Sequence, residues 1–265
     1  MVTPNSIVGV FVQIVPPLAI VRIQNPTHHN AMTLEMWQKL PAVLAEAGAD
    51  PRVNVVIIRG AGEIAFVSGA DISEFSTIRT TGALARNYDK ANSIAFAAIR
   101  RCEKPTIAMI HGYCMGGGFG IAAACDLLYA ADDCKFSIPA AKLGIGYPVD
   151  AVVDIVSAVG PAVAKELFFT AKVVASDEAL KLGIVNAVFS KSDLETEVLN
   201  TANTIAAGAP LTLLAAKKAI AAVLQPKDRT VEEAYAAAEV CFDSKDYEEG
   251  VAAFLEKRNA NFKGC

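Results

Sequence analysis

The chain has 265 residues, of which 53% are hydrophobic and 20% are charged, and its 24 basic and 28 acidic side chains give a net charge of −4. This length suffices for one or two domains with a substantial buried core, and the apolar fraction excludes a disordered chain. The isoelectric point near 5.5 offers no basic surface for a phosphate backbone, which argues against nucleic-acid binding.

The cysteines and the N-terminal segment indicate the environment of the protein. Its six cysteines stand singly, without the paired spacing of a zinc site, and we expect them to be small buried hydrophobes. No basic residue precedes Arg22, and polar Gln13 and two prolines interrupt the apolar stretch before it, which is not typical of a signal peptide or a membrane span. We therefore expect a reduced, cytoplasmic, soluble protein that binds no membrane. The cysteines are Cys102, Cys114, Cys125, Cys134, Cys241 and Cys265.

The N-terminal part of the chain predicts a hairpin and a helix. Residues 8–15 and 18–23 have the composition of strands, and Pro16-Pro17 forms the turn between them. Thr33 fits the N-cap of a helix that ends near Gly48.

The middle of the chain alternates between apolar strands and helices. Residues 53–58 are too apolar to alternate, which predicts a strand covered on both faces. A loop over 60–71 and a helix over 84–99 follow, and further buried strands are predicted at 106–110 and 127–131. This alternation predicts an α/β core.

The C-terminal part is predicted to be almost entirely helical. One more strand is expected at 184–189, and such a helical tail caps the core or packs on neighbouring subunits. The helices are predicted at 176–182, 193–207, 210–224, 230–243 and 246–257.

A glycine cluster over residues 111–120 follows the strand at 106–110. Three interpretations compete for it. The first is a tight turn that binds no ligand. The second is a dinucleotide-binding site, but the distance along the chain to the next strand is too short for that motif. The third is an oxyanion site, in which backbone N–H groups at the start of a helix bind a negatively charged oxygen. A second N–H donor would then come from the turn at Ser68-Gly69-Ala70, which also leads into a helix.

Several segments together resemble the crotonase superfamily, also called the enoyl-CoA hydratase/isomerase family. Their order and spacing cover about residues 7–263. The matching segments are Asn30-Ala31-Met32, residues 66–72, Lys104-Pro105-Thr106, residues 112–118, Cys125-Asp126-Leu127, residues 179–186 and residues 254–258.

The resemblance implies a crotonase-like α/β spiral of ββα turns and an acyl-CoA substrate. It implies an acyl-CoA-binding core over 1–200, and a helical region over 201–265 that builds a homotrimer or a hexamer and closes over CoA. It places the oxyanion amides on Ala70 and Gly117. No metal, and no cofactor beyond the CoA part of the substrate, is expected. CoA contacts are implied for Ser68, Ile72, Phe254 and Lys257, the last two across a subunit boundary.

The sequence departs from the family's hydratases at both acid–base positions. The two usual glutamates are replaced by Gly120 and Ala140, and the aspartate of some isomerases and dehalogenases falls on Pro148. Because hydration of an enoyl thioester needs a base and an acid, ordinary hydratase chemistry lacks its proton carriers.

The turn at Tyr147 resembles the methylmalonyl-CoA decarboxylase-like branch of the family, although that branch has a histidine in place of Ala70 and a glutamate in place of Gly120. Decarboxylation leaves an enolate and needs no general base, so a neutral phenol suits it. Tyr147 is then either catalytic or part of the pocket wall. Asp150 is either a substitute base or a carboxylate that stabilises a helix N-terminus.

Four functions remain open. A decarboxylase-like lyase acting on a short carboxyacyl-CoA ranks first. An enoyl-CoA hydratase or isomerase with a non-standard acid/base follows, then a thioester hydrolase or a non-catalytic CoA-binding protein. We further expect Asp71 and Asp126 to be structural and His111 to be a core histidine whose ring is hydrogen-bonded.

Overall fold

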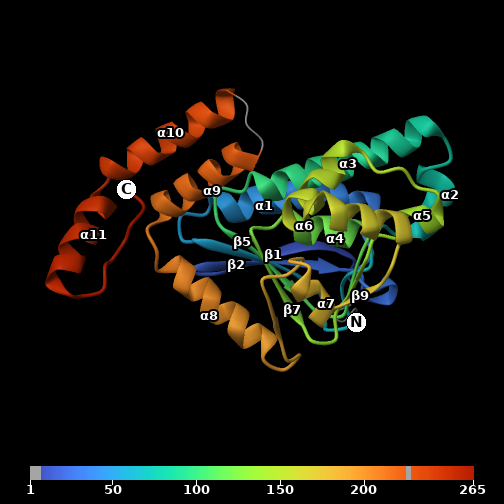
Figure 1. The fold of residues 1–265 in the computed structure, drawn as a ribbon, viewed down its shortest axis with the longest axis horizontal. Helices are drawn as coiled ribbons and strands as arrows, with labels where there is room; N and C mark the ends of the chain where they lie inside the picture. Colours follow the sequence, from blue (N-terminus) through green and yellow to red (C-terminus); the bar gives the residue numbers. More distant parts are fainter. Residues whose placement is uncertain (1–6, 225–227) are drawn as a thin grey trace.

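Two β-sheets form the centre of the protein in the computed structural model, which describes residues 7–224 and 228–265 (Figure 1). The larger has the order β1-β2-β3-β5-β7-β10 and the smaller the order β4-β6-β8-β9. Pairing is parallel except between β1 and β2 and between β8 and β9. The larger sheet contains β1 (Gly9–Val15), β2 (Leu18–Gln24), β3 (Val55–Gly60), β5 (Thr106–Ile110), β7 (Leu127–Ala131) and β10 (Ala187–Phe189). The smaller contains β4 (Ala65–Val67), β6 (Tyr113–Met115), β8 (Lys135–Ser137) and β9 (Val174–Ala175).

The chain winds through the two sheets as a spiral. Each turn places one strand in the larger sheet, the next strand in the smaller sheet, and then a helical segment: β3 and β4, β5 and β6, and β7 and β8 are such pairs. The predicted α/β spiral of ββα turns is therefore confirmed. The helices of the core are α1 (Leu34–Ala49), α2 (Phe75–Ile78), α3 (Gly82–Arg100), α4 (Gly117–Ala123), α5 (Ala140–Leu143), α6 (Val149–Thr170) and α7 (Ser176–Lys181), with short 3-10 turns η2 (Pro26–His28) and η3 (Ile72–Glu74).

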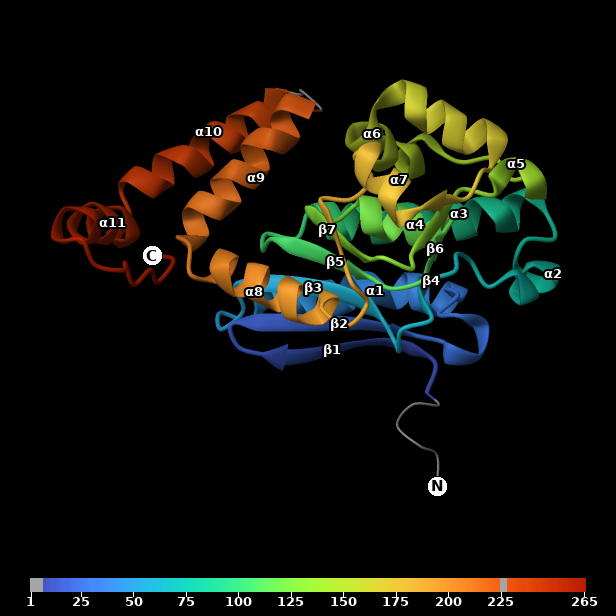
Figure 2. The same ribbon diagram turned by 60° about the horizontal axis from the view of Figure 1, so that its bottom comes forward.

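The C-terminal helices continue away from this core. Helix α8 (Leu194–Ala206) packs on β3, β5 and β7, whereas α9 (Pro210–Leu224), α10 (Asp228–Phe242) and α11 (Lys245–Glu256) extend to one end of the molecule (Figures 1 and 2). The predicted division after residue 200 falls within α8. In the described ranges, no individual helix is long and apolar enough to span a membrane. Helices α8 and α9 together reach that length and apolar composition, but they meet at a bend of 103°.

The elements expected from the sequence are mostly present. The strands at 106–110 and 127–131 have the predicted bounds, and Thr33 caps α1 by accepting a hydrogen bond from the Met36 N–H at 3.2 Å. The loop expected over 60–71 contains β4, and β6, β8 and β9 were not predicted. Helix α6 was anticipated only at its start, since Gly160, with φ 76°, and Pro161 interrupt its pattern.

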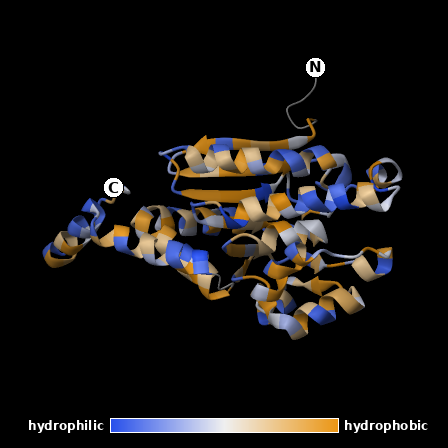
Figure 3. Ribbon diagram, turned by 90° about the horizontal axis from the view of Figure 1, so that it is seen from above, coloured by the Kyte–Doolittle hydropathy of each residue, from blue (hydrophilic) through white to orange (hydrophobic). Residues whose placement is uncertain are grey.

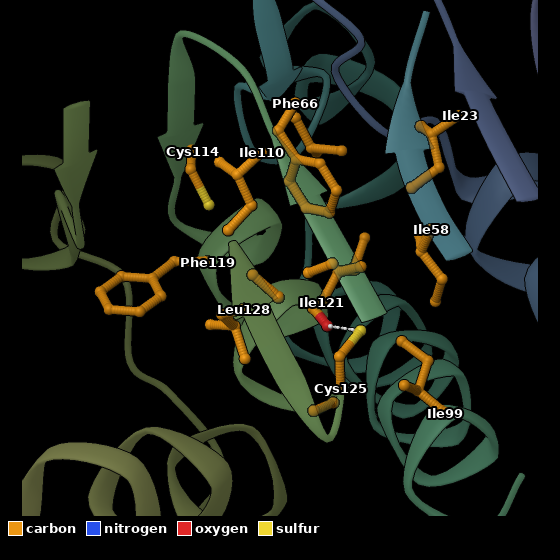
Figure 4. Close-up of a cluster of buried hydrophobic side chains, with 14 of the residues drawn as sticks. Ile23, Ile58, Phe66, Ile99, Ile110, Cys114, Phe119, Ile121, Cys125 and Leu128 are labelled. Carbon is orange, nitrogen blue, oxygen red and sulfur yellow. Dashed lines mark hydrogen bonds between the residues drawn. The ribbon is translucent and has the colours of Figure 1, made fainter. Parts of the chain in front are cut away.

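The core lies between the sheets and the helices packed on them. Strands of the larger sheet are mostly apolar, whereas the helices around them alternate between apolar and polar residues (Figure 3). Helix α4 is itself buried, and Phe119 and Ile121 project from it among side chains of the strands (Figure 4). Four cysteines are buried without disulfides, as expected, but Cys241 is half-buried and Cys265 is exposed, so the prediction was wrong for these two.

Two aspartates hold loops to the core, which confirms the structural role expected for them. Asp126 accepts hydrogen bonds from the N–H and hydroxyl of Thr106 at 2.7 and 2.8 Å and pairs with Lys217 at 2.7 Å. Asp71 caps η3 and accepts from the Ser73 N–H and hydroxyl at 3.1 and 2.6 Å. Burial alone would raise the pKa of Asp71, but these hydrogen bonds hold it below its ordinary value.

His111, at the end of β5, differs from its prediction. Its side chain is buried, yet neither ring nitrogen has a hydrogen-bond partner among the described residues. Burial, assisted by the charge of Arg59, lowers the pKa of His111 below its ordinary value. The charges around it come from Arg59, Glu63, Asp133 and Lys191. An unpaired buried ring of this kind costs about 1–3 kcal/mol.

Replacement of His111 by leucine is expected to raise the free energy of unfolding by about 1 kcal/mol, because an apolar side chain leaves no polar atom unpaired. Since the native state lowers the pKa of His111, the unfolded chain binds protons more readily below about pH 6.5, and wild-type stability falls there as the pH falls. In His111→Leu, this contribution to the change of unfolding free energy with pH should be absent. Urea denaturation at pH 7.5 and pH 5.5 measures both effects. An unchanged slope in His111→Leu would contradict the prediction.

Candidate active site

Two glycine-containing turns meet at one edge of the smaller sheet. Because β4 and β6 pair in parallel, their carboxyl ends lie side by side, and each leads into a helical turn. The ideal Cβ position of Gly69 is 3.9 Å from the Gly117 nitrogen, so the turn before Ala70 lies against the start of α4. Gly69 has φ 110° and Gly116 has φ 51°, a region of backbone conformation that favours glycine.

The backbone N–H groups of Ala70 and Gly117 have no protein acceptor in the described part of the chain. At Ala70 this follows from the local pairing, in which the Met32 N–H donates to the Gly69 carbonyl and the Asp71 N–H donates to the Met32 carbonyl. At Gly117 it follows from the position at the first turn of α4, where N–H groups have no helical partner. The two turns predicted from the sequence therefore each supply one free donor.

Close backbone packing fixes the position of α4. A Cβ on Gly118 would lie 2.1 Å from the Val67 carbonyl oxygen, and a Cβ on Gly117 would lie 2.9 Å from Cζ2 of Trp37. Only glycine permits this approach, which brings the helix start against β4.

A pocket of about 90 Å³ opens beside these two turns. Most of its wall is apolar or aromatic, and Asp89 and Arg79 are its charged residues. The pocket is lined by Trp37, Ser68, Gly69, Ala70, Ile72, Phe75, Arg79, Tyr88, Asp89, Asn92, Phe96, Gly116, Gly117, Pro139, Ala140, Leu143, Ile145, Gly146, Tyr147, Pro148 and Ala151.

Tyr147 brings a hydroxyl to the same place. Its oxygen is 3.4 Å from the ideal Cβ position of Gly116, the residue before the free Gly117 amide. Its ring packs edge to face on Phe168, with centroids 5.2 Å apart. Burial raises the pKa of Tyr147 to about 12, so the phenol is neutral near pH 7 and can donate a hydrogen bond.

The two positions that the resemblance assigns to glutamates are small and surrounded by apolar groups. A Cβ on Gly120 would lie 2.7 Å from Cζ of Phe96, so the Phe96 ring fills the space of any side chain at residue 120. That ring also meets Trp37 edge to face, with centroids 5.4 Å apart. Ala140 is buried and lines the pocket. An aromatic wall thus stands beside Gly120.

Asp150 does not reach this pocket. It is exposed in the first turn of α6 and is not among the lining residues. Asp154, one turn further, is buried and pairs with Arg100 at the end of α3. Burial raises the pKa of Asp154 to about 6, against the lowering effect of Arg100. Asp154 therefore connects α6 to α3, while Asp150 faces solvent at the helix start.

Sequence reasoning missed the polar residues that α3 contributes to the pocket. Asp89 pairs with Arg79 at 2.9 Å, and burial raises the pKa of Asp89. The Asn92 side-chain oxygen is buried and has no hydrogen-bond partner among the residues that the structure describes. The signal was the helical spacing: Asp89 and Asn92 lie about one turn apart, between Tyr88 and Phe96, which are buried. Identifying this face required knowledge of the packing of α3 over the two turns.

The residues implied for CoA binding divide into two groups. Ser68 and Ile72 line the pocket. Phe254 is 84% exposed on α11, and Lys257 follows that helix at its end. Helix α11 lies at the opposite end of the molecule from α2 and α5, two helices that contribute lining residues to the pocket (Figures 1 and 2). Across residues 7–224 and 228–265, no group of three or more His, Cys, Asp or Glu side chains could hold a metal ion.

Comparison with known proteins identifies the family. The model of the enoyl-CoA hydratase/isomerase family matches residues 15–265. The chain is 35% identical to a crotonyl-CoA hydratase of Syntrophomonas wolfei, over 92% of this chain and 94% of that protein. It is 35% identical to a peroxisomal Delta(3,5)-Delta(2,4)-dienoyl-CoA isomerase of Arabidopsis thaliana, over 91% and 90%.

A solved structure agrees. The crystal structure of an enoyl-CoA hydratase/carnithine racemase from Magnetospirillum magneticum superposes with a TM-score of 0.92 at 35% identity, covering 98% of this chain and 97% of that one. Fold, motif order and sequence similarity agree over nearly the whole chain. The protein belongs to the crotonase superfamily, the enoyl-CoA hydratase/isomerase family of acyl-CoA-processing enzymes.

Proposed function

We propose that this family member is a decarboxylase-like lyase that acts on a short carboxyacyl-CoA through an enolate. The observation that carries the proposal is the Tyr147 hydroxyl beside Gly116, in a pocket that Ala140 lines, while position 120 holds glycine. The site thus offers a neutral phenol and two amides, whereas hydration needs groups that move protons at those two positions. Decarboxylation is the enolate chemistry that such a set serves best.

In this proposal the Ala70 and Gly117 amides bind the thioester oxygen. When the bond between the α-carbon and the carboxylate breaks, its electron pair enters the enolate, the negative charge develops on that oxygen, and carbon dioxide leaves. Amides aimed at developing oxygen charge lower the barrier because they are already oriented. Neither amide has a protein acceptor within residues 7–224 and 228–265, which supports this role.

Tyr147 orients the carboxylate out of the thioester plane by donating a hydrogen bond, which prepares the breaking bond to overlap with the carbonyl. Its pKa of about 12 keeps the proton on the phenol before reaction. After carbon dioxide leaves, the α-carbon takes a proton that comes ultimately from solvent. The apolar wall of Trp37 and Phe96 supports the reaction, because a carboxylate is less stabilised there than in water.

The CoA part of the substrate is proposed to lie outside the acyl pocket, along Ser68 and Ile72, and no other cofactor is part of the proposal. Phe254 and Lys257 would reach CoA from a neighbouring subunit of a homotrimer or a hexamer. The exposure of apolar side chains on α10 and α11, including Phe242 at 68% and Leu255 at 74%, supports a partner chain on these helices.

A second candidate is hydration or isomerisation of an enoyl-CoA with Asp89 as the proton carrier. Asp89 is the carboxylate that lines the pocket, and burial raises its pKa, as suits a general base or acid. The names of the relatives, a hydratase and a dienoyl-CoA isomerase, also favour it. Asp150 is the weaker choice, because it is exposed outside the pocket.

The test is a panel of short acyl-CoA and carboxyacyl-CoA thioesters followed by mass spectrometry. Loss of carbon dioxide supports the proposal, addition of water or a shifted double bond supports the second candidate, and free CoA indicates hydrolysis. A panel in which no substrate loses carbon dioxide contradicts the lyase.

Tyr147→Phe is expected to lower kcat of the decarboxylation by at least about tenfold, or about 1.4 kcal/mol. The ring and its packing on Phe168 remain, but the hydrogen bond to the carboxylate in the transition state is lost. Steady-state kinetics measure the effect. Tyr235→Phe, at a position 71% exposed on α10, is the matched control and should match wild type. Equal activity of Tyr147→Phe and wild type would show that Tyr147 only lines the pocket and that its hydroxyl takes no part in the reaction.

A further inference from the structure

Arg79 is held at the mouth of the pocket by two aromatic rings. It ends α2, where its N–H donates to the Phe75 carbonyl at 3.2 Å. Its guanidinium carbon lies 4.9 Å from the Phe75 ring centre and 5.0 Å from the Tyr88 ring centre. Contacts between a guanidinium and ring faces fix its plane and are favourable when partly shielded from water. Arg79 is thus a preorganised cation in the pocket wall.

The hydrogen-bonding capacity of this guanidinium is mostly unused. Its side chain is 14% exposed, and in the described ranges its side chain bonds only to Asp89, through Nη2 to Oδ1 at 2.9 Å. A guanidinium carries five N–H donors in a planar fork. The unused donors are not sealed in the protein interior, and Arg79 is one of the residues that line the pocket. Because this shielded guanidinium has so few hydrogen-bond acceptors in the protein, we expect a bound ligand to supply one.

The surroundings define what that acceptor is. Besides Asp89, no lining residue is charged, so the pocket itself holds no second anion for Arg79. The planar fork matches a carboxylate, which it binds through two parallel hydrogen bonds. Asp89 engages Arg79 through Nη2, which leaves the other donors of the fork for a ligand carboxylate.

We infer that Arg79, held by Phe75 and Tyr88 and oriented by Asp89, binds a carboxylate on the acyl group and so selects carboxyacyl-CoA over uncharged acyl-CoA. This inference rests on the proposed function, since it takes an acyl-CoA as the ligand. Arg79 is a specificity residue in it and moves no proton. An anion could also come from the CoA phosphates, and the test separates the two sources.

The test compares two unreactive thioethers of CoA with the same CoA part. S-(2-carboxyethyl)-CoA carries a carboxylate, and S-(3-methylbutyl)-CoA carries an uncharged group of the same shape. Titration calorimetry with the full-length protein gives Kd for each. We expect wild type to bind the carboxylate analogue at least about tenfold more tightly, as charge-assisted hydrogen bonds allow. Equal or weaker binding of the carboxylate analogue by wild type would overturn the inference.

Arg79→Met should lower this preference to about twofold or less while the uncharged analogue keeps its wild-type Kd, which also shows that the variant folds. Arg79→Lys, which retains the charge without the fork, should keep only part of the preference. Arg86→Met is the matched control, because Arg86 is exposed on α3 and does not line the pocket, and it should match wild type. Equal weakening of both analogues by Arg79→Met would assign Arg79 to the phosphates and overturn the inference.

The two proposals fail separately. If wild type binds both analogues equally while the panel loses carbon dioxide, the lyase stands and the role of Arg79 is overturned. If the carboxylate preference depends on Arg79 but no thioester loses carbon dioxide, the substrate class stands and the lyase is wrong. If wild type shows no carboxylate preference and no thioester loses carbon dioxide, both fail.

Discussion

Gly118→Ala is expected to lower kcat by about 10²–10³ and the free energy of unfolding by about 1–3 kcal/mol. The added Cβ would lie 2.1 Å from the Val67 carbonyl oxygen and 2.7 Å from the Val67 Cβ. Neither can yield easily, because β4 is paired with β6 through Val67 and Cys114. Helix α4 therefore has to move, and the Gly117 amide moves with it away from the thioester oxygen.

Kinetics on the substrate found in the panel and urea denaturation measure these two effects. Gly48→Ala is the control, since Gly48 lies in α1 with ordinary space for a Cβ, 3.9 Å from the Cys102 sulfur. This control should be neutral or stabilised by up to about 1 kcal/mol. Wild-type kcat in Gly118→Ala would show that the contact with Val67 does not set the position of the amide.

Trp37→Ala is expected to lower the free energy of unfolding by about 3–5 kcal/mol, the largest stability effect we predict. The Trp37 side chain is fully buried and lies under Gly117. Its Nε1–H donates to the Tyr88 hydroxyl at 2.8 Å, which in turn donates to the Met32 carbonyl at 3.3 Å. Removing the indole leaves a cavity beneath the helix start and leaves the Tyr88 oxygen without its donor.

Urea denaturation measures this loss, and Phe169→Ala provides the comparison. Phe169 is 74% exposed on α6, so its truncation should change stability by at most about 0.5 kcal/mol. A Trp37→Ala variant within 1 kcal/mol of wild type would mean that the cavity collapses and that Trp37 does not support α4.

The sequence predicted the larger sheet better than the smaller one, for a physical reason. Strands β5 and β7 are five-residue apolar runs, and burial on both faces makes such runs visible in any sequence. Strands β4, β6 and β8 have three residues each. Three residues are too few to show the alternation of polar and apolar side chains that marks a strand. These segments pair as strands because the preceding strands of the larger sheet bring them beside one another.

The site divides in the same way. Local backbone signals, the glycines before Ala70 and Gly117, predicted where the free amides lie. The pair of Asp89 and Arg79 could not be predicted, because the two residues come together only when α3 packs over the turn after η3. The exposed position of Asp150 could not be predicted for the same reason: helical spacing indicates a face, but only the packing of α6 decides which residue of that face is covered.

The contact between Gly120 and Phe96 constrains how this sequence can change over evolutionary time. A Cβ at residue 120 would meet the Phe96 ring at 2.7 Å, and that ring is itself held against Trp37. A glutamate at residue 120 therefore requires the Phe96 ring to shift or residue 96 to become smaller. The two positions are expected to be coupled: Gly120→Glu alone overpacks this region, and a smaller side chain at residue 96 relieves the overpacking.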